Sequence, residues 1–295
     1  MTRLLELLVT GLSLGMLYSL VAMGFVVIFK GTRVVNFAQG SLLVLGAYVV
    51  ARLAPSIGFW PAAAAGAAAS VLAGALIRLL LSRARTDDPT APAIATIGID
   101  IVLTTDLTRR IGPDVLPMGD PWGSATVDLA GVTVPQARIA AMAAAVIVLG
   151  LLLVLFRHTN WGVSMRAASA DPEAASLMGI RLSRVATVSW LIGGALAAVA
   201  GVFMSTFPSA GLDSNAGTIA LAAVPAVILG GLDSTRGAVV GGLAVGVAKT
   251  LTAGYGDELS FLGDGFGDIS PYVLMMIVLL WRPSGLFGTR EFHRV

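Results

Sequence analysis

The chain has 295 residues, of which 56% are hydrophobic and 12% are charged, with a formal net charge of +2 and a mean hydropathy of +0.87. A soluble domain carries roughly 25% charged residues, so this composition excludes an ordinary soluble protein and predicts a membrane protein. The basic residues occur singly between apolar stretches, which gives no support for nucleic-acid binding. The absence of cysteine excludes disulfides and thiolate sites, and both histidines, His158 and His293, fall in expected loops, so no metal site is expected.

Successive apolar stretches predict an all-α, polytopic transmembrane helical bundle of about eight spans, formed as a single domain over residues 1–295. The first stretch, 4–29, is about 39 Å long as a helix and can cross a ~30 Å hydrocarbon core. It lacks a strong basic leader and an A-x-A cleavage site, so it is expected to be a span rather than a signal peptide. The 35 glycines and the long alanine runs predict closely approaching helices.

Several later stretches are expected to be short or broken helices. Gly40 and Gly46 make 37–53 a span that is broken or tucked against its neighbours. The further expected spans are 60–81, 93–111, 139–156, 185–207, a short pair at 218–231 and 238–251 around the sequence GGLDSTRG, with Pro225 breaking the first of the pair, and 269–281. Residues 112–135 are rich in Pro, Gly and Asp, which predicts an external loop with room for one hairpin.

Five polar residues lie within or at the edge of expected spans and are candidates for a translocation path. Thr96, Asp100 and Thr104 recur every four residues and so share one helix face, while Asn36 and Gln39 lie near the membrane boundary. An ionisable residue at membrane depth usually faces the bundle interior or water. A structural interpretation stays open for all of them: helix capping and interhelical hydrogen bonding for Asn36 and Gln39, and a carboxylate satisfied by hydroxyls or an arginine for Asp100.

Asp106 favours a structural role. It lies three and four residues before Arg109 and Arg110, the spacing at which helical side chains of opposite charge pair. Asp106 is therefore expected to form ion pairs within its own helix.

The chain has a long polar, basic segment between two apolar spans, at about 157–186. Within it, Asp171 is a helix N-cap, Pro172 suits the first helical position and Gly179 supplies the stop. These signals predict a two-turn helix of about 10 Å over residues 172–178. The side chains of Leu177, Met178 and Ile180 are expected to be exposed and apolar, and such a short helix needs a partner to bury them.

Several motifs resemble known permeases. Glu173, Ala174 and Ala175, followed by Gly179, resemble the EAA loop of ABC importer permeases, the cytoplasmic helix that docks into a groove on the ATPase subunit. The usual continuation Ile-x-Leu-Pro keeps only its leucine here, at Leu191. Five stretches resemble the branched-chain amino acid permeases of the hydrophobic amino acid uptake family: RHTNWG at 157–162, ASLMGI at 175–180, LIGGALAAVAGVF at 191–203, VVNFAQGSLLVLGAY at 34–48 and ATIGIDIVL at 95–103.

Three of the polar residues depart from the family pattern. Gln39 stands where histidine is common, Asp100 where a small hydroxyl residue is usual, and Thr104 where glutamine is usual. The departures at Asp100 and Thr104 leave the identity of the substrate open.

The resemblance implies the transmembrane subunit of an ABC importer for branched-chain or related amino acids, or for urea or short amides. The implied partners are a second homologous permease subunit in a heterodimer, two ATPase subunits, an external solute-binding protein and membrane lipid. No G-x-x-x-x-G-K-[ST] phosphate loop occurs in the sequence, so the chain is expected not to be an enzyme and to bind no cofactor itself, with ATP and Mg on the ATPase subunits. The residues implied to couple to the ATPase are Asp171, Pro172, Glu173, Ala174, Ala175, Leu177, Met178, Gly179 and Ile180.

A cytoplasmic docking loop fixes the expected orientation in the plasma (inner) membrane, with the N-terminus outside and the C-terminus inside. The positive-inside rule supports it, since 12 of the 19 basic residues then fall inside: Lys30, Arg33, Arg83, Arg85, Arg157, Arg166, Arg181, Arg184, Arg236, Arg282, Arg290 and Arg294.

Two other classes of protein remain as alternatives. An ion-coupled secondary transporter could use Asp100 to bind a coupling proton or sodium ion. An intramembrane aspartyl protease could use the sequence from Gly265 to Asp268, which matches the pattern GxGD, but this motif lies in an acidic loop.

Overall fold

The structure is a computed structural model that describes residues 2–83, 90–123, 125–129, 132–206, 211–213, 217, 221–259, 261, 263 and 265–289. Within these residues, seven helices are long and apolar enough to cross a membrane, and one shorter apolar helix follows them. The prediction of an all-α, polytopic bundle is confirmed, apart from one small β-hairpin. The predicted inside residues Arg85, Arg290 and Arg294, together with His293, lie outside the described residues.

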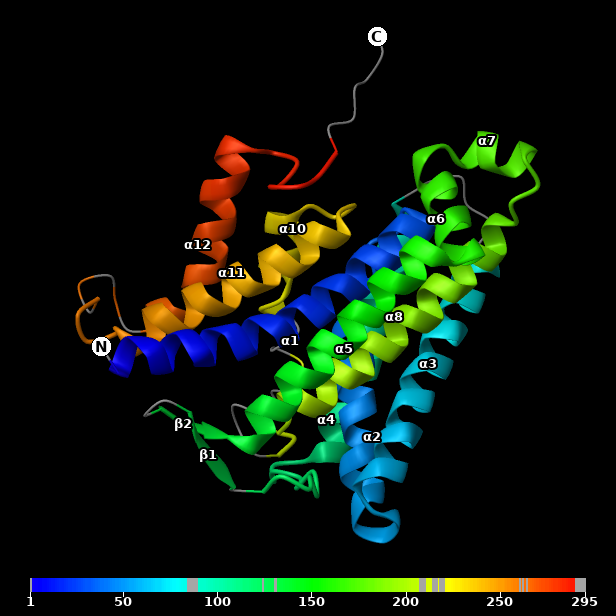
Figure 1. Cartoon of the computed structure of the whole chain (residues 1–295). Coiled ribbons are helices and arrows are strands. Elements are labelled where there is room, and N and C mark those ends of the chain that lie inside the picture. Colours follow the sequence, from blue (N-terminus) through cyan, green and yellow to red (C-terminus); the bar gives the residue numbers. More distant parts are fainter. Residues whose placement is uncertain are drawn as a thin grey trace.

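Figure 1 labels the elements in chain order. The seven long helices are α1 (Thr2–Thr32), α2 (Gln39–Ile57), α3 (Phe59–Arg83), α4 (Ala91–Ile111), α5 (Gln136–His158), α8 (Leu182–Met204) and α11 (Thr235–Gly254). The shorter helices are α6 (Asn160–Ala170), α7 (Pro172–Leu177), α10 (Val224–Gly230) and α12 (Phe266–Trp281), and the strands are β1 (Thr126–Leu129) and β2 (Val132–Pro135).

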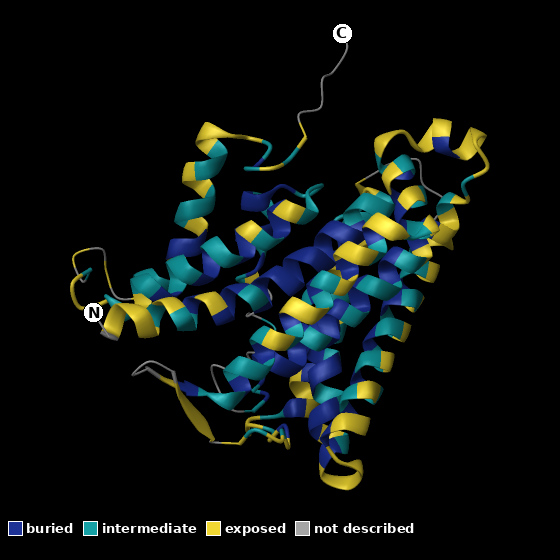
Figure 2. Ribbon diagram, in the orientation of Figure 1, coloured by how far each residue is buried: buried dark blue, intermediate teal, exposed yellow. Residues whose placement is uncertain are grey.

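Helices α1 and α8 form the centre of the molecule, and their ribbons are mostly dark blue in Figure 2. α1 packs along α11 on one side and α8 on the other, and α2 and α3 pack against each other and against α8. Leu17, Leu20 and Trp190 are among the largest fully buried side chains of this core. By contrast, α3, α4 and α5 leave most of their side chains exposed or only partly buried, as helices do when they face lipid or another chain.

Glycines make the closest helix contacts possible. A Cβ atom at Gly11 or Gly15 of α1 would lie only 2.8 Å from a backbone Cα of α11, and a Cβ at Gly46 of α2 would lie 2.8 Å from Ser70 Oγ of α3. Both distances are shorter than a Cβ atom tolerates, so these helices approach as closely as small-residue interfaces in membranes allow. The expectation that 37–53 is tucked against its neighbours is confirmed, although α2 is one continuous helix.

The connection between α4 and α5 contains one β-hairpin, in the stretch 112–135 where the sequence predicted a loop that could hold one. β1 and β2 pair antiparallel, with Thr126 opposite Pro135. Figure 1 shows the hairpin at the end of the bundle opposite α7.

The stretch that contains Pro225 is interrupted, as predicted. Residues 222 and 223 form a turn, and Pro225 lies in the first turn of the short helix α10 that follows, where a missing N–H costs nothing. The polar segment after α5 contains a second helix, α6, that the sequence did not reveal because it has no clear apolar periodicity. Thr159 caps α6 by accepting the backbone N–H of Gly162 at 3.1 Å, and Trp161 stacks on Phe156 of α5 with ring centroids 5.3 Å apart.

Candidate functional site

Helix α7 begins as its sequence predicts. The Asp171 side chain accepts the backbone N–H of Ala174 at 3.0 Å, and Pro172 occupies the first turn. An Asp at this position satisfies one of the backbone donors that a helix start leaves without a partner. The start of this short surface helix is therefore fixed by residues adjacent to it in the sequence.

The end of α7 is a Schellman motif. Gly179 has φ of +82°, and its N–H donates to the carbonyl of Ser176 at 2.9 Å. The N–H of Ile180 donates to the carbonyl of Ala175 at 3.0 Å, which closes the six-residue ring of this motif. The predicted stop at Gly179 is confirmed, with Met178 as the C-cap rather than the last helical residue.

The tip of α7 presents two large apolar side chains. Leu177 is 89% exposed and Met178 is 83% exposed, as predicted. Ile180 was expected beside them, but it is half-buried and packs against the hydrophobic core, because the Schellman turn reverses the chain after Gly179. Ala175 is 4% exposed and anchors the other side of α7, which contacts α6 and α8. Glu173 and Ala174 are exposed.

The residues between α1 and α2 form a buried polar network. Asn36 and Gln39 are both fully buried; the Asn36 amide donates to Gln39 Oε1 at 3.1 Å, and the Gln39 amide donates to the Gly193 carbonyl of α8 at 3.1 Å. Asn36 Oδ1 also accepts the N–H of Ala38 at 3.1 Å. Each of these polar groups is hydrogen-bonded either at the start of α2 or to a neighbouring helix. This arrangement agrees with the structural interpretation, helix capping and interhelical hydrogen bonding.

The start of α2 is capped by side chains of α4. α2 has no side-chain cap of its own, since its N-cap residue is Ala38. Instead, Asp100 Oδ1 accepts the N–H of Ser41 at 3.2 Å, and Thr96 Oγ1 accepts the N–H of Phe37 at 3.1 Å. A carboxylate at a helix N-terminus also interacts favourably with the helix dipole. Asp100 is thus bound by Ser41, through its backbone N–H and its side-chain hydroxyl, which supports the structural interpretation in which hydroxyls satisfy this carboxylate.

Thr104 does not share this role. Its side chain is half-buried, one turn beyond Asp100, and its methyl group would be 3.6 Å from a Cβ atom placed at Gly217. The structure therefore brings Thr96 and Asp100 to one helix start and leaves Thr104 beside a different segment.

Asp106 forms the ion pairs predicted for it. Its oxygens lie 3.1 Å from Arg109 and 2.6 Å from Arg110. Asp268, the aspartate of the GxGD pattern, lies in the first turn of α12 and pairs with Lys249 of α11 at 2.9 Å. An aspartyl protease needs two aspartates that share a proton, whereas Asp268 is held by a cation.

The sequence did not single out three cations at the end of the bundle that carries α7. Lys30, Arg33 and Arg78 line one pocket there, together with the indole of Trp190. Lys30 and Arg33 served only as markers of topology, because a lone basic residue after an apolar stretch is ordinary in membrane proteins.

Comparison with known proteins identifies the family. Residues 7–280 match the family model described as the branched-chain amino acid transport system / permease component. The chain is 30% identical to the high-affinity branched-chain amino acid transport system permease protein LivH of Salmonella typhimurium, over 99% of this chain and 97% of that protein. It is 28% identical to the permease protein BraD of Pseudomonas aeruginosa, which is named for the same transport system, over 99% and 98% of the two chains.

A more distant relative carries a different name. The fructose import permease protein FrcC of Rhizobium meliloti is 26% identical over 73% of this chain and 62% of that protein. The match to the family model covers most of the sequence and includes α7, the α2 start and, apart from the first residues of α1, every long helix. The chain is a multi-pass membrane protein that belongs to the family of permease components of branched-chain amino acid transport systems.

Proposed function

We propose that this chain is the membrane-spanning subunit of an ATP-driven importer, and that α7 is the element through which an ATPase subunit drives it. The observation that carries the proposal is the tip of α7. Two large apolar side chains, Leu177 and Met178, are exposed on a helix of six residues that is fixed at both ends by local hydrogen bonds. An exposed apolar cluster on a rigid support is typical of an interaction site.

The substrate class follows from the relatives alone. The relatives that cover nearly the whole chain are named for branched-chain amino acid transport, which supports branched-chain or related amino acids as the cargo. Urea and short amides stay within the proposal because Asp100 and Thr104 depart from the family pattern. An external solute-binding protein would deliver the cargo, and a second permease subunit would complete the assembly.

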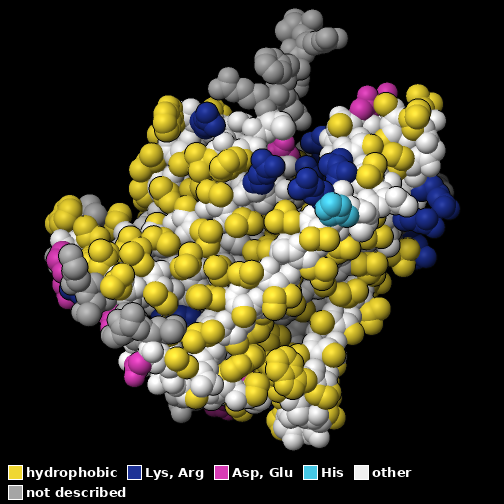
Figure 3. All heavy atoms as spheres, in the orientation of Figure 1, with side chains coloured by type: hydrophobic (Ala, Val, Ile, Leu, Met, Phe, Trp, Pro, Cys, Tyr) yellow, Lys and Arg dark blue, Asp and Glu magenta, His cyan; other side chains and the backbone are white. Residues whose placement is uncertain are grey.

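The charge distribution supports a cytoplasmic location for the α7 end. Figure 3 shows Lys and Arg side chains gathered at this end, above a broad apolar surface, with acidic side chains near the N-terminus. The basic residues at this end include Lys30, Arg83, Arg157, Arg181 and Arg236, each at or next to the end of a helix. On the positive-inside rule we propose that α7 and the C-terminus lie in the cytoplasm and the N-terminus outside, in the plasma (inner) membrane.

The fold is compatible with that orientation. Seven long helices and α12 make eight crossings, which alone would leave both termini on one side. The segment between α8 and α11 adds a ninth passage: Leu212 pairs with Leu116 in the α4–α5 connection, whereas Asp233 contacts Lys30 at the α7 end, and α10 is a helical part of this passage. With nine passages the termini lie on opposite sides.

A charge at the tip of α7 tests the docking role. The double variant Leu177→Glu, Met178→Glu should insert and fold normally, because both side chains are solvent-exposed, but it should no longer co-purify with the ATPase subunits or support uptake. Leu177→Met is the matched control, since it keeps an apolar side chain of similar volume. Wild-type co-purification and uptake in the double variant would show that α7 is not the docking element.

A further inference from the structure

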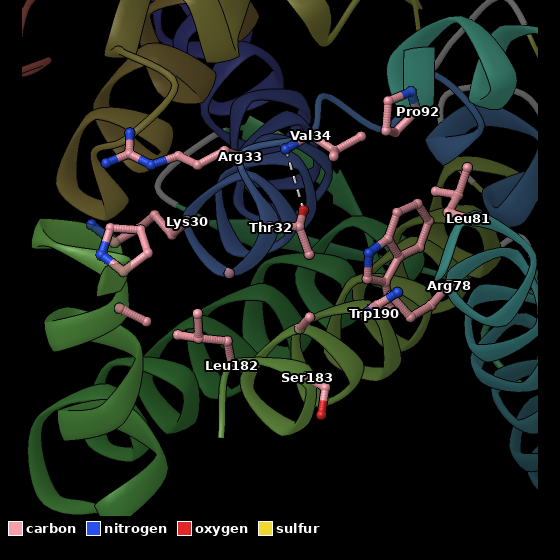
Figure 4. A pocket seen from close by; sticks show the side chains of 14 residues that line it. Lys30, Thr32, Arg33, Val34, Arg78, Leu81, Pro92, Leu182, Ser183 and Trp190 are labelled. Atoms are coloured by element: carbon pink, nitrogen blue, oxygen red, sulfur yellow. Dashed lines mark hydrogen bonds between the residues drawn. The ribbon is translucent and has the colours of Figure 1, made fainter. Parts of the chain in front are cut away.

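A pocket with a volume of about 350 Å³ opens at the α7 end of the bundle (Figure 4). This volume lies at the lower end of the range for small-molecule sites, about 300–1,000 Å³. Six helices and the segment after α1 contribute to its wall. The lining residues used below are Lys30 of α1, Arg33 of the segment after it, Arg78 and Leu81 of α3, Pro92 of α4, Ala168 of α6, Pro172 of α7 and Trp190 of α8.

The lining carries positive charge only. Lys30, Arg33 and Arg78 belong to it, and no Asp or Glu is among the lining residues that the structure describes. Figure 4 shows Arg78 and Trp190 together on one side of the pocket and Lys30 and Arg33 on the other. An apolar-walled space with cations on two sides attracts an anion, because low-dielectric walls strengthen the attraction.

Two buried donors in this pocket have no hydrogen-bond partner. They are Arg78 Nε and Trp190 Nε1, and the Trp190 side chain is 0% exposed. A buried donor left without an acceptor is destabilising, so almost all such groups in folded proteins have one. Two of them in one positively charged pocket indicate an acceptor that the chain itself does not supply within its described residues.

The cations on the other side are held in place by carbonyl groups. Lys30 Nζ donates to the carbonyl of Asp233 at 2.9 Å, and Arg33 donates to the carbonyl of Ser169 at 2.5 Å. These contacts fix the two cations at the pocket wall.

We propose that this pocket binds an organic anion, with its carboxylate or phosphate group between Arg78 and Trp190 and its apolar part against Leu81 and Pro92. Arg78 Nε and Trp190 Nε1 donate to the anion, and Lys30 and Arg33 add positive charge from the opposite wall. The same chemistry has two sources: a small carboxylic acid dissolved in the adjoining aqueous compartment, or the headgroup of an anionic phospholipid.

Occupancy of the pocket would change the mobility of the segment around α7. Ala168 of α6 and Pro172 of α7 line the same pocket as Arg78, so an anion there joins the bundle to the base of α7. Binding should slow backbone hydrogen exchange in residues 165–180. This readout requires neither an ATPase subunit nor transport, so its failure is distinct from a failure of the proposed docking role.

The test uses the purified full chain in nanodiscs. In discs of phosphatidylcholine alone, 4-methylpentanoate is titrated while thermal unfolding and hydrogen exchange are followed. In discs that contain phosphatidylglycerol, retention of that lipid is measured by native mass spectrometry. Saturable stabilisation by the carboxylate identifies a soluble ligand, and selective retention of phosphatidylglycerol identifies a lipid; either result supports the site if it depends on the residues above.

Three variants test whether binding depends on the residues of the pocket. Arg78→Gln should weaken binding about tenfold or more, since it removes a charged donor, and Trp190→Phe should weaken it about threefold, since it removes a neutral donor and keeps the ring. Arg83→Gln, in the last turn of α3 and outside the pocket, should bind as the wild type does. If Arg78→Gln does not fold, Trp190→Phe alone decides.

Two results would overturn the proposal. One is that neither probe binds to the wild-type chain. The other is that Trp190→Phe and Arg83→Gln bind equally well, which would mean that the anion is attracted only by the general positive charge at this end of the bundle.

Discussion

An aspartate carboxylate caps the N-terminus of both α7 and α2, but the aspartate of α7 is adjacent in the sequence and that of α2 comes from another helix. In α7, the carboxylate of Asp171 accepts an N–H three residues later in the sequence, at 3.0 Å. In α2, the carboxylate of Asp100 accepts the N–H of Ser41 at 3.2 Å, across 59 residues and from another helix. The α7 cap can be changed without disturbing the bundle, whereas the α2 cap also holds α4 to the core.

The difference matters most for α4, which has few other attachments. Its exposed face carries Ile94, Ile97, Ile101 and Val102, and it packs mainly against α2. The two hydrogen bonds from Thr96 and Asp100 therefore fix the position of a helix that apolar packing alone holds weakly. The same kind of bond thus stabilises a local surface element in one place and a tertiary contact in the other.

The largest expected effect comes from removing the distant cap. Asp100→Ala should lower the stability of the purified chain by about 2 kcal/mol, because a helix N-terminus loses its acceptor and α4 loses an attachment. Thermal unfolding in detergent measures this effect, and Asp100→Asn, which keeps an acceptor oxygen, should retain most of the stability. Equal losses in both variants would mean that the charge of Asp100, rather than its hydrogen bond, is what α2 needs.

A shorter side chain at position 100 distinguishes two roles of Asp100, as the cap of α2 or as a residue of the translocation path. Asp100→Ser should reduce the yield of assembled complex while leaving transport per complex unchanged, because its hydroxyl does not reach as far as the Asp100 carboxylate does. Normal yield with an altered transport rate or substrate preference would instead place Asp100 on the translocation path.

The second bond from α4 should matter somewhat less. Thr96→Val keeps the shape of the side chain but leaves the N–H of Phe37 without its acceptor, at a cost of about 1–2 kcal/mol in unfolding free energy. Thr96→Ser, which keeps the hydroxyl, is the matched control. If thermal unfolding gives the same stability for Thr96→Val and Thr96→Ser, the hydrogen bond to the N–H of Phe37 contributes nothing to stability.

At the end of α7, the expected cost is local and about 1 kcal/mol. Gly179→Leu places a side chain at φ of +82°, where the surroundings leave space but the backbone conformation is unfavourable. Global unfolding should hardly change, whereas co-purification with the ATPase subunits should fall. Gly179→Asn, which tolerates positive φ, should bind better than the leucine variant. Wild-type transport by Gly179→Leu would contradict the docking role.

The smallest effect is expected at the local cap. Asp171→Ala should cost at most about 1 kcal/mol and only within α7. Hydrogen exchange should become faster in residues 172–178 and stay unchanged in α2, with Asp171→Asn as the control that keeps an acceptor. A fall in global melting temperature as large as that of Asp100→Ala would remove the distinction between the two helix starts.

The same distinction explains what the sequence could predict. The helix at α7, its N-cap and its glycine stop depend on residues that are neighbours in the chain, so sequence alone located them. The ion pairs of Asp106 lie at helical spacing and were predicted for the same reason. The spans were predicted because length and hydropathy are also local properties.

What depends on distant contacts could not be predicted. Nothing in the sequence shows that Asp100 faces the backbone of Ser41, or that Arg78 and Trp190, more than 100 positions apart, line one pocket. The burial of Ile180 was missed because the Schellman turn directs this side chain to the core of the bundle, and the shape of that core cannot be predicted from the local sequence. Helix α6 was missed because its stability comes from packing on α5 and α7 rather than from its own periodicity.

The segment that follows α12 completes the half-length helix α10. The N–H groups of Leu286 and Phe287 donate to the carbonyls of Leu229 and Gly230, at 2.8 and 3.1 Å, where α10 ends. During synthesis, α10 leaves the ribosome before α11, α12 and the residues that satisfy its carbonyls exist. The region around α10 therefore reaches its final form only after the last span has been inserted. A protein that ended at Trp281 would keep every span in full, yet the carbonyls at the end of α10 would lack these two donors.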